Sequence, residues 1–260
     1  MQRILASMLF AACAVSASAT TITIMSASSI ANAQAEENAW VTSTFGNNWD
    51  PQILETFEGF KASNTSGYNS LATGVGTFSV MPGSQAGDPV QSNGTKKDQF
   101  TILNAADSPF SGRYDTTPGG NNWLDSNDIT QIQLNTSLTT LLFMITDVND
   151  CGGILTLQTG DGTTSSAFAH APTARDGNIY FVGITSSNAL GTVKWLNNSS
   201  NDGWGIDDLG SIVDPPPPPP YQPPTSPVPE PSAWPILAAG LIAIPLMRKY
   251  RKPRISQVLG

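Results

Sequence analysis

Short runs in which apolar or β-branched residues alternate with polar ones recur along the middle of the chain. A period of two residues is typical of β-strands that bury one face. Turn residues such as those of Pro82-Gly83 and Asp161-Gly162 separate the runs. The pattern predicts strands over residues 77–80, 99–103, 129–134, 141–146, 154–158, 166–170, 179–184 and 191–195.

The run 141–145 is apolar at every position, which indicates a central strand with both faces buried. Only 12% of the residues are charged, and the chain has no long stretch rich in Ala, Glu, Lys and Leu, which argues against a helical protein. We therefore expect an all-β domain at residues 34–214, built as a two-sheet antiparallel β-sandwich of jelly-roll type.

The first 33 residues have the pattern of an export signal. Arg3 is followed by an uncharged stretch that lasts until Glu36 and contains the apolar run 4–15. Ala31-Asn32-Ala33 has the small-x-small pattern that signal peptidase accepts. The sequence therefore predicts a signal peptide at residues 1–33, cleaved after Ala33.

Two alternatives remain at this end of the chain. Ala17-Ser18-Ala19 is an earlier small-x-small site. Cys13 would allow a lipoprotein, although Phe10 stands where Leu is expected. Without Cys13 the mature chain holds one thiol, Cys151, which excludes an internal disulfide and is typical of a small buried residue.

Prolines dominate the segment that follows the predicted domain. Residues 215–229 contain ten prolines, and since proline fixes φ and lacks an amide donor, this stretch should be extended polyproline II. At about 3.1 Å per residue, it would form a stalk roughly 45 Å long. A proline-rich ligand for another domain is the alternative. We assign residues 215–228 to the linker.

The last thirty residues predict a short membrane segment. Residues 232–247 are uncharged and, as a helix, would span about 24 Å of a hydrocarbon core of about 30 Å. Trp234 at one interface and basic side chains at the other would make up the difference. The positive-inside rule places the basic end in the cytoplasm and the β-domain outside. The basic residues are Arg248, Lys249, Arg251, Lys252 and Arg254.

This tail resembles the PEP-CTERM sorting signal, because Val-Pro-Glu-Pro precedes the apolar helix and the basic end. The resemblance implies that Pro229, Glu230 and Pro231 are recognised by an exosortase-type transpeptidase. It assigns residues 229–254 to the sorting tail, with 255–260 as an extension beyond the family's usual end. The chain would then pass through an inner-membrane-anchored intermediate to the cell surface or the extracellular space. A permanent single-pass anchor is the alternative.

Residues 34–214 carry 19 Asp and Glu against 6 Lys and Arg. Such an acidic domain should repel phosphate backbones, which argues against nucleic acid as a partner. Divalent cations and cationic polymers remain possible partners. In the alternative, the acidic surface only keeps the protein soluble.

Two landmarks bracket the predicted domain, Thr56-Phe57-Glu58-Gly59-Phe60 near its start and Ile206-Asp207-Asp208 at its end. They resemble extracellular jelly-roll modules, including MAM-like and lectin-like domains and the ectodomains of other PEP-CTERM proteins. The resemblance implies that the first and last strands are neighbours, which brings Glu58 close to Asp207 and Asp208. Three converging carboxylates would suit a structural Ca²⁺. In the alternative, one Asp points into solvent and the other caps a turn.

Other candidate chemistry is sparse. The acidic loops 125–128 and 147–152 lack EF-hand spacing and are typical of Asx turns. No nucleophile elbow, P-loop or zinc-protease motif occurs, and a lone strand histidine, His170, is a weak general base. Three tryptophans in Gly-, Asn- and Asp-rich contexts could stack on sugar rings or pack internally: Trp49, Trp123 and Trp204.

The sequence thus predicts an exported, non-enzymatic surface or extracellular-matrix protein. Its expected partners are signal peptidase, an exosortase-like transpeptidase and the inner membrane, with extracellular polysaccharide as a further contact. A dedicated carbohydrate-binding module is the first alternative. A glycosidase that works with carboxylates alone is the second.

Overall fold

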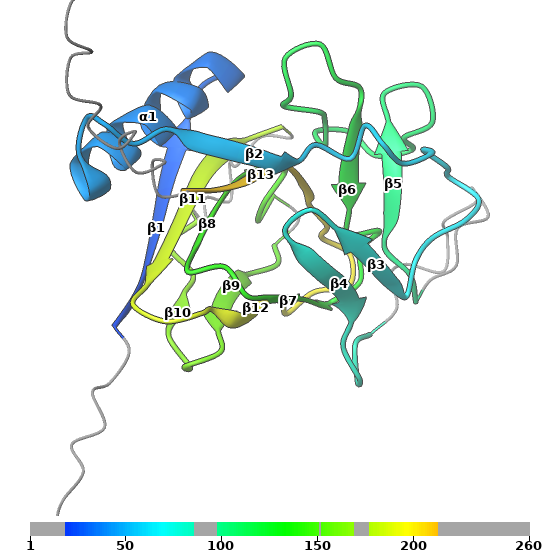
Figure 1. The fold of residues 1–260 in the computed structure, drawn as a ribbon. Helices are drawn as coiled ribbons and strands as arrows, with labels where there is room; N and C mark the ends of the chain where they lie inside the picture. Colours follow the sequence, from blue (N-terminus) through cyan, green and yellow to red (C-terminus); the bar gives the residue numbers. More distant parts are fainter. Residues whose placement is uncertain (1–18, 86–97, 151, 169–176, 213–260) are drawn as a thin grey trace, which may run out of the picture. The chain divides into compact units, whose positions relative to one another are not determined.

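Strands are the main secondary structure in the computed structural model, which describes residues 19–85, 98–150, 152–168 and 177–212 (Figure 1). These residues belong to one unit, and the second unit, residues 216–260, lies outside them. The elements are β1 (Thr20–Ala27), α1 (Ile30–Phe45), β2 (Pro51–Glu55), β3 (Ser70–Thr73), β4 (Gly76–Val80), β5 (Thr101–Asn104), β6 (Asn122–Asp125), β7 (Gln131–Thr136), β8 (Thr140–Thr146), β9 (Leu155–Thr159), β10 (Thr164–Ser165), β11 (Ile179–Ser186), β12 (Gly191–Asn197) and β13 (Gly205–Ile212).

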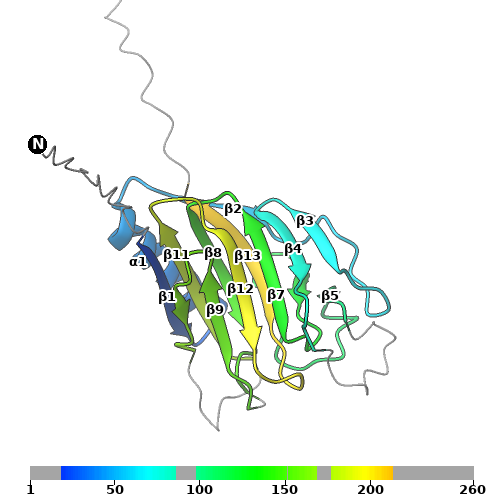
Figure 2. The same ribbon diagram turned by 90° about the horizontal axis from the view of Figure 1, so that it is seen from below.

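Two antiparallel sheets form a β-sandwich, as the alternating pattern predicted. The seven-stranded sheet has the order β1-β11-β8-β13-β6-β5, and β2 pairs with β13 outside this path. The six-stranded sheet has the order β10-β9-β12-β7-β4-β3. Figure 2 shows the six-stranded sheet in front of the seven-stranded one.

Large side chains from both sheets fill the space between the layers. The ring of Phe143 on β8 lies 5.5 Å from the ring of Trp195 on β12, which also packs against Phe78 on β4. All three side chains are fully buried. Buried Phe, Trp and Leu side chains of this size supply most of the free energy that stabilises a sandwich.

The prediction that residues 141–145 are buried on both faces is confirmed. Phe143 and Ile145 belong to the core between the sheets, whereas Leu142 and Met144 face the other way, toward α1. Alternate residues of a strand point to opposite faces, so a strand covered on both sides needs apolar residues at every position.

Helix α1 covers part of the outer face of the seven-stranded sheet (Figure 1). Its N-cap Ser29 accepts a hydrogen bond from the Asn32 amide at 3.2 Å, and Gly46 ends it at φ 95°. Trp40 lies flat on Gly183 of β11, where an added Cβ would come within 2.4 Å of the indole ring. The absence of a side chain at this glycine therefore lets the helix approach the sheet closely.

The fold begins earlier than predicted. All eight residues of β1 pair with β11, in register from Thr20 with Ser186 to Ala27 with Ile179. The boundary expected between residues 33 and 34 falls inside α1, where Ala33 is fully buried. The segment after residue 19 is therefore part of the sandwich in this structure.

The strand predictions differ from the structure in a few places. The strand expected over 166–170 is replaced by the short β10 just before it, and residues 169–170 lie outside the described part of the chain. The pattern gave no strand for β1, β2, β3, β6 or β13. The expectation that the first and last strands of the predicted domain are neighbours is confirmed, because β2 pairs with β13.

Candidate functional site

Buried carboxylates gather on the outer face of the seven-stranded sheet, next to the part that α1 covers. Asp207 of β13 pairs with Met144 of β8, and Asp125 of β6 pairs with Gly205 of β13, so both carboxylates lie on the same side as the residues under α1. The connection between β5 and β6, residues 105–121, supplies most of their hydrogen-bond donors. We call this group of contacts the carboxylate layer.

A single arginine of this connection holds three carboxylates. Arg113 is 8% exposed and forms ion pairs from Nη1 to Asp125 at 3.1 Å, from Nη2 to Asp128 at 2.6 Å and from Nε to Asp147 at 3.4 Å. Its guanidinium also lies 3.9 Å from the centre of the Phe110 ring. Burial alone would lower the pKa of Arg113, but the three carboxylates outweigh it and raise the pKa. The guanidinium therefore stays charged.

The two acidic loops predicted as Asx turns meet at this arginine. The amide of Asn127 donates to Asp125 Oδ1 at 2.7 Å, which is an Asx turn as expected. Asn127, Asp128 and Asp147 adopt positive φ angles of 51°, 59° and 63°. Asn and Asp tolerate this conformation better than most side chains, because their short polar groups bond locally. That the two loops share one cation could not be seen in the sequence.

The second part of the carboxylate layer is centred on Asp207. Its Oδ2 accepts hydrogen bonds from the amides of Thr116 at 2.8 Å and Thr117 at 3.1 Å. The neighbouring Asp208 accepts from the hydroxyl of Thr117 at 2.6 Å and from that of Thr116 at 3.1 Å. Both carboxylates therefore fix the same turn of the β5–β6 connection.

Neighbouring residues of a strand normally point to opposite faces. Here the register with β8 shifts between Asp207 and Gly210, and Asp208 has a φ of 51°. This irregularity turns Asp208 toward the side on which Asp207 already lies, as β-bulges do. The adjacent Asp pair therefore works on one side of the sheet.

The structure brings the predicted calcium ligands near one another. Glu58 accepts hydrogen bonds from the amides of Asn121 and Asn122, both at 2.7 Å. The charges of Glu58 and Asp208 both act on Asp115, whose carboxyl group is in hydrogen-bonding contact with Asp207. In the described part of the chain, however, no group of three or more His, Cys, Asp or Glu is arranged to hold a metal ion. The calcium site at these residues stays a prediction.

Burial dominates the electrostatics of this group. It raises the pKa of Asp207 to about 9, with the charge of Asp208 as the next cause. Burial also raises the pKa values of Asp115 and Asp208. On α1, burial and then Asp208 raise the pKa of Glu37 to about 7. Asp207 therefore holds its proton at neutral pH, and Glu37 is partly protonated there.

The tryptophans considered for sugar stacking are mainly packing residues. Trp123 lies in β6 rather than in a loop, is 1% exposed and donates from Nε1 to Asp125 at 3.3 Å. Trp204 directly precedes β13, is 1% exposed and lies 6.0 Å from Trp195 in a stacked arrangement. Trp49 is half-buried and lies 5.9 Å from Phe45 of α1. Neither Trp123 nor Trp204 offers a free ring face to a ligand.

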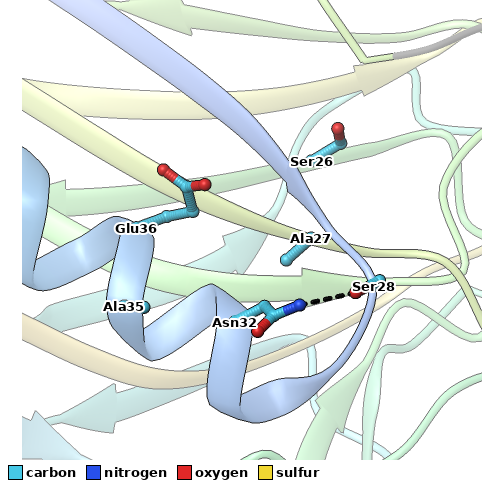
Figure 3. A pocket seen from close by; sticks show the side chains of 6 residues that line it. All are labelled: Ser26, Ala27, Ser28, Asn32, Ala35 and Glu36. Carbon is cyan, nitrogen blue, oxygen red and sulfur yellow. Dashed lines mark hydrogen bonds between the residues drawn. The ribbon is translucent and has the colours of Figure 1, made fainter.

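A shallow pocket lies where β1 leads into α1 (Figure 3). In it the Asn32 side chain donates to Ser28 Oγ at 2.6 Å, and Glu36 is the one charged lining residue. Figure 3 shows these side chains on both sides of the bend between strand and helix. Such a lining contains no histidine, lysine or arginine.

Several predicted residues lie outside the described part of the chain. These are Cys13, Cys151 and His170, the motif Pro229, Glu230 and Pro231, and the basic residues Arg248, Lys249, Arg251, Lys252 and Arg254. The short membrane helix expected over 232–247 also lies there. Among the residues that the structure does describe, none of the helices is both long and apolar enough to span a bilayer.

No protein-family model matches this chain. No curated protein and no solved structure is significantly similar to it. The functional argument therefore rests on the residues and contacts described above.

Proposed function

We propose that this protein is an exported, non-enzymatic module of the bacterial cell surface or matrix, with a sandwich of jelly-roll type carried on a proline-rich stalk. The supporting observation is where the ordered elements begin and end. The first strand starts at Thr20, directly after Ala17-Ser18-Ala19, and the last strand ends at Ile212, just before the proline run that starts at Pro215. The elements thus lie between a peptidase site and the stalk.

This proposal moves the cleavage site to Ala19, the earlier of the two sequence alternatives. Cleavage after Ala33 would remove β1, whose Ile22 and Ile24 pack against the core, together with the N-cap Ser29. It would also remove four of the six residues that line the pocket in Figure 3. Cleavage after Ala19 leaves every described element complete.

Matched substitutions test the site of cleavage. Ala17→Arg places a large cation three residues before the Ala19 bond, and Ala31→Arg does the same for the Ala33 bond. Ala31 is exposed on α1, so its replacement should not disturb packing. N-terminal mass spectrometry should find Thr20 first in the wild type and in Ala31→Arg, and uncleaved precursor in Ala17→Arg. A mature chain that starts at Gln34 would overturn this part of the proposal.

The sorting tail is tested separately. Glu230→Gln together with alanine at Pro229 and Pro231 should leave the full-length chain in the membrane fraction, whereas the wild type should appear at the surface with a shortened C-terminus. Pro223→Ala, in the stalk, is the matched control and should behave as the wild type. Equal processing of the sorting variant and the control would contradict recognition of the Pro-Glu-Pro motif.

Polysaccharide contact is the second candidate function, and the composition of one sheet favours it. The six strands β3, β4, β7, β9, β10 and β12 contain no Asp or Glu, and their one charged residue is Lys194. Lys194 lies beside Gln158 and Gln133, in a row of amide and ammonium groups. In an acidic chain, this sheet would repel an anionic polymer least. Loss of glycan-array binding when all three residues become alanine would support the contact, and unchanged binding would exclude this face.

A further inference from the structure

A polar site lies where the loop after β8 meets the loop after β12. Three successive amides of the first loop donate to three different side chains: Gly153 to Asp202 Oδ2 at 2.9 Å, Ile154 to Asn198 Oδ1 at 2.8 Å and Leu155 to Asn149 Oδ1 at 2.9 Å. Amides held in this way fix the positions of the oxygens that accept from them. The two loops therefore form a fixed frame lined by side-chain oxygens.

Asp202 is the buried acid of this frame. It is 1% exposed, and its Oδ1 has no hydrogen-bond donor among the described residues. The carboxyl group of Asp150 is in direct contact with that of Asp202. An added Cβ at Gly153 would come within 2.4 Å of Asp202 Oδ2 and 2.7 Å of Asn197 Oδ1. Glycine at this position is what allows these oxygens to lie so close to the loop backbone.

Two carboxyl groups in contact repel each other unless a proton or a cation lies between them. Arg113 also acts on Asp202 electrostatically, but its guanidinium already pairs with three other carboxylates. Among the described residues, the Asp150–Asp202 pair therefore has no cation of its own.

We propose that Asp150 and Asp202 bind a divalent hard cation, of which Ca²⁺ is the best fit. Ca²⁺ takes carboxylate, amide and water oxygens at variable geometry, and Asn197 Oδ1 is an amide oxygen beside the pair. A site with only two carboxylates carries little negative charge for a calcium site. The affinity should accordingly lie in the range of extracellular modules, with a Kd on the order of 10⁻⁴–10⁻³ M. This inference does not depend on the route by which the chain leaves the cell.

The test uses the purified full chain with CaCl₂ as the only added ligand. Calcium at about 100 times Kd should raise the Tm by roughly 5–10 °C for a domain of this size, because it binds the folded chain alone. Asp150→Asn keeps the size of the side chain and should abolish the shift. Asp202→Asn should do the same, and its amide oxygen can still accept from Gly153.

Asp207→Asn is the matched control, because it removes a carboxylate from the other predicted calcium site. It should keep the calcium shift of the wild type. Absence of any shift in the wild type at 10 mM CaCl₂, about tenfold above the weakest expected Kd, would overturn the proposal and leave a shared proton between Asp150 and Asp202. A shift that Asp207→Asn abolishes while Asp150→Asn retains it would place the cation at Asp207 instead. Failure of export or of sorting in the cell would not affect any of these outcomes.

Discussion

Replacing Arg113 by methionine tests whether the carboxylate layer holds the fold together. The guanidinium is 8% exposed and pairs with Asp125, Asp128 and Asp147 at 2.6–3.4 Å. Methionine keeps most of the volume but removes the guanidinium, with its charge and its contact with the Phe110 ring. Three carboxylates would then remain without their cation, and Asp125 among them is fully buried.

The expected cost follows from that arrangement. Removing one partner of a buried ion pair destabilises proteins by about 3–5 kcal/mol, since a buried charge is left uncompensated. Burial already raises the pKa of Asp125, and the charge of Arg113 opposes this rise. Without the arginine the pKa should rise further, so protonation at low pH should remove part of the cost.

Urea unfolding measures both effects. The free energy of unfolding of Arg113→Met should fall by about 3–5 kcal/mol at neutral pH, and the loss should shrink as the pH approaches 5. Lys194→Met is the matched control, because Lys194 is only partly buried and its side chain bonds to one neutral partner, Gln158, at 3.3 Å. A loss below about 1 kcal/mol, the size of a surface ion pair, or a loss that does not change with pH, would refute the reasoning.

Two further predictions concern the outer face of the seven-stranded sheet. Asp207 and Glu37 keep their protons in the folded chain up to about pH 9 and about pH 7, but release them near pH 4 when unfolded. The free energy of unfolding should therefore be highest in acid and decrease from about pH 5 to about pH 8. Each group contributes up to about 1.4 kcal/mol per pH unit to this decrease. A free energy of unfolding that rises over this interval would contradict the raised pKa values. Gly183→Ala should displace Trp40 and lower the free energy of unfolding by about 1–3 kcal/mol. Gly59→Ala, whose added Cβ meets no atom within 4 Å, should be nearly neutral. Equal Tm values of the two variants would show that the helix does not depend on this contact.

The sandwich was predictable because its strands follow the two-residue period. Residues 141–145 were predictable for a different reason. Five consecutive apolar residues require cover on both faces, and the structure provides it. Helix α1 gave no such signal, because its buried side chains are few and differ in character: Ala33, Glu37, Trp40 and Val41. An Ala-rich start next to an apolar leader has the composition of a peptidase site, which is why the domain was expected to begin too late.

The carboxylate layer was only partly predictable. The bracketing of the chain by Glu58 and the Asp207–Asp208 pair indicated that these groups would come close, as they do. Arg113 could not be foreseen, because its partners are 12 to 34 residues away in the sequence and depend on residues with positive φ. Trp123 was expected in a loop because polar residues surround it, but those polar residues are themselves buried and hydrogen-bonded.

The outer face of the seven-stranded sheet has two halves with different chemistry. Under α1 it is apolar, with Leu142, Met144 and Phe181 against the helix, whereas toward β13 and β6 it is polar, with Asp207 and Asp125 held by the β5–β6 connection. The carboxylates of the polar half receive these hydrogen bonds from residues outside α1. The apolar half is covered mainly by α1, with Trp49 and Tyr114 also packed against it, so loss of β1 and the start of α1 would expose part of it to water. On these grounds we expect cleavage after residue 19 to preserve the sandwich and cleavage after residue 33 to weaken it.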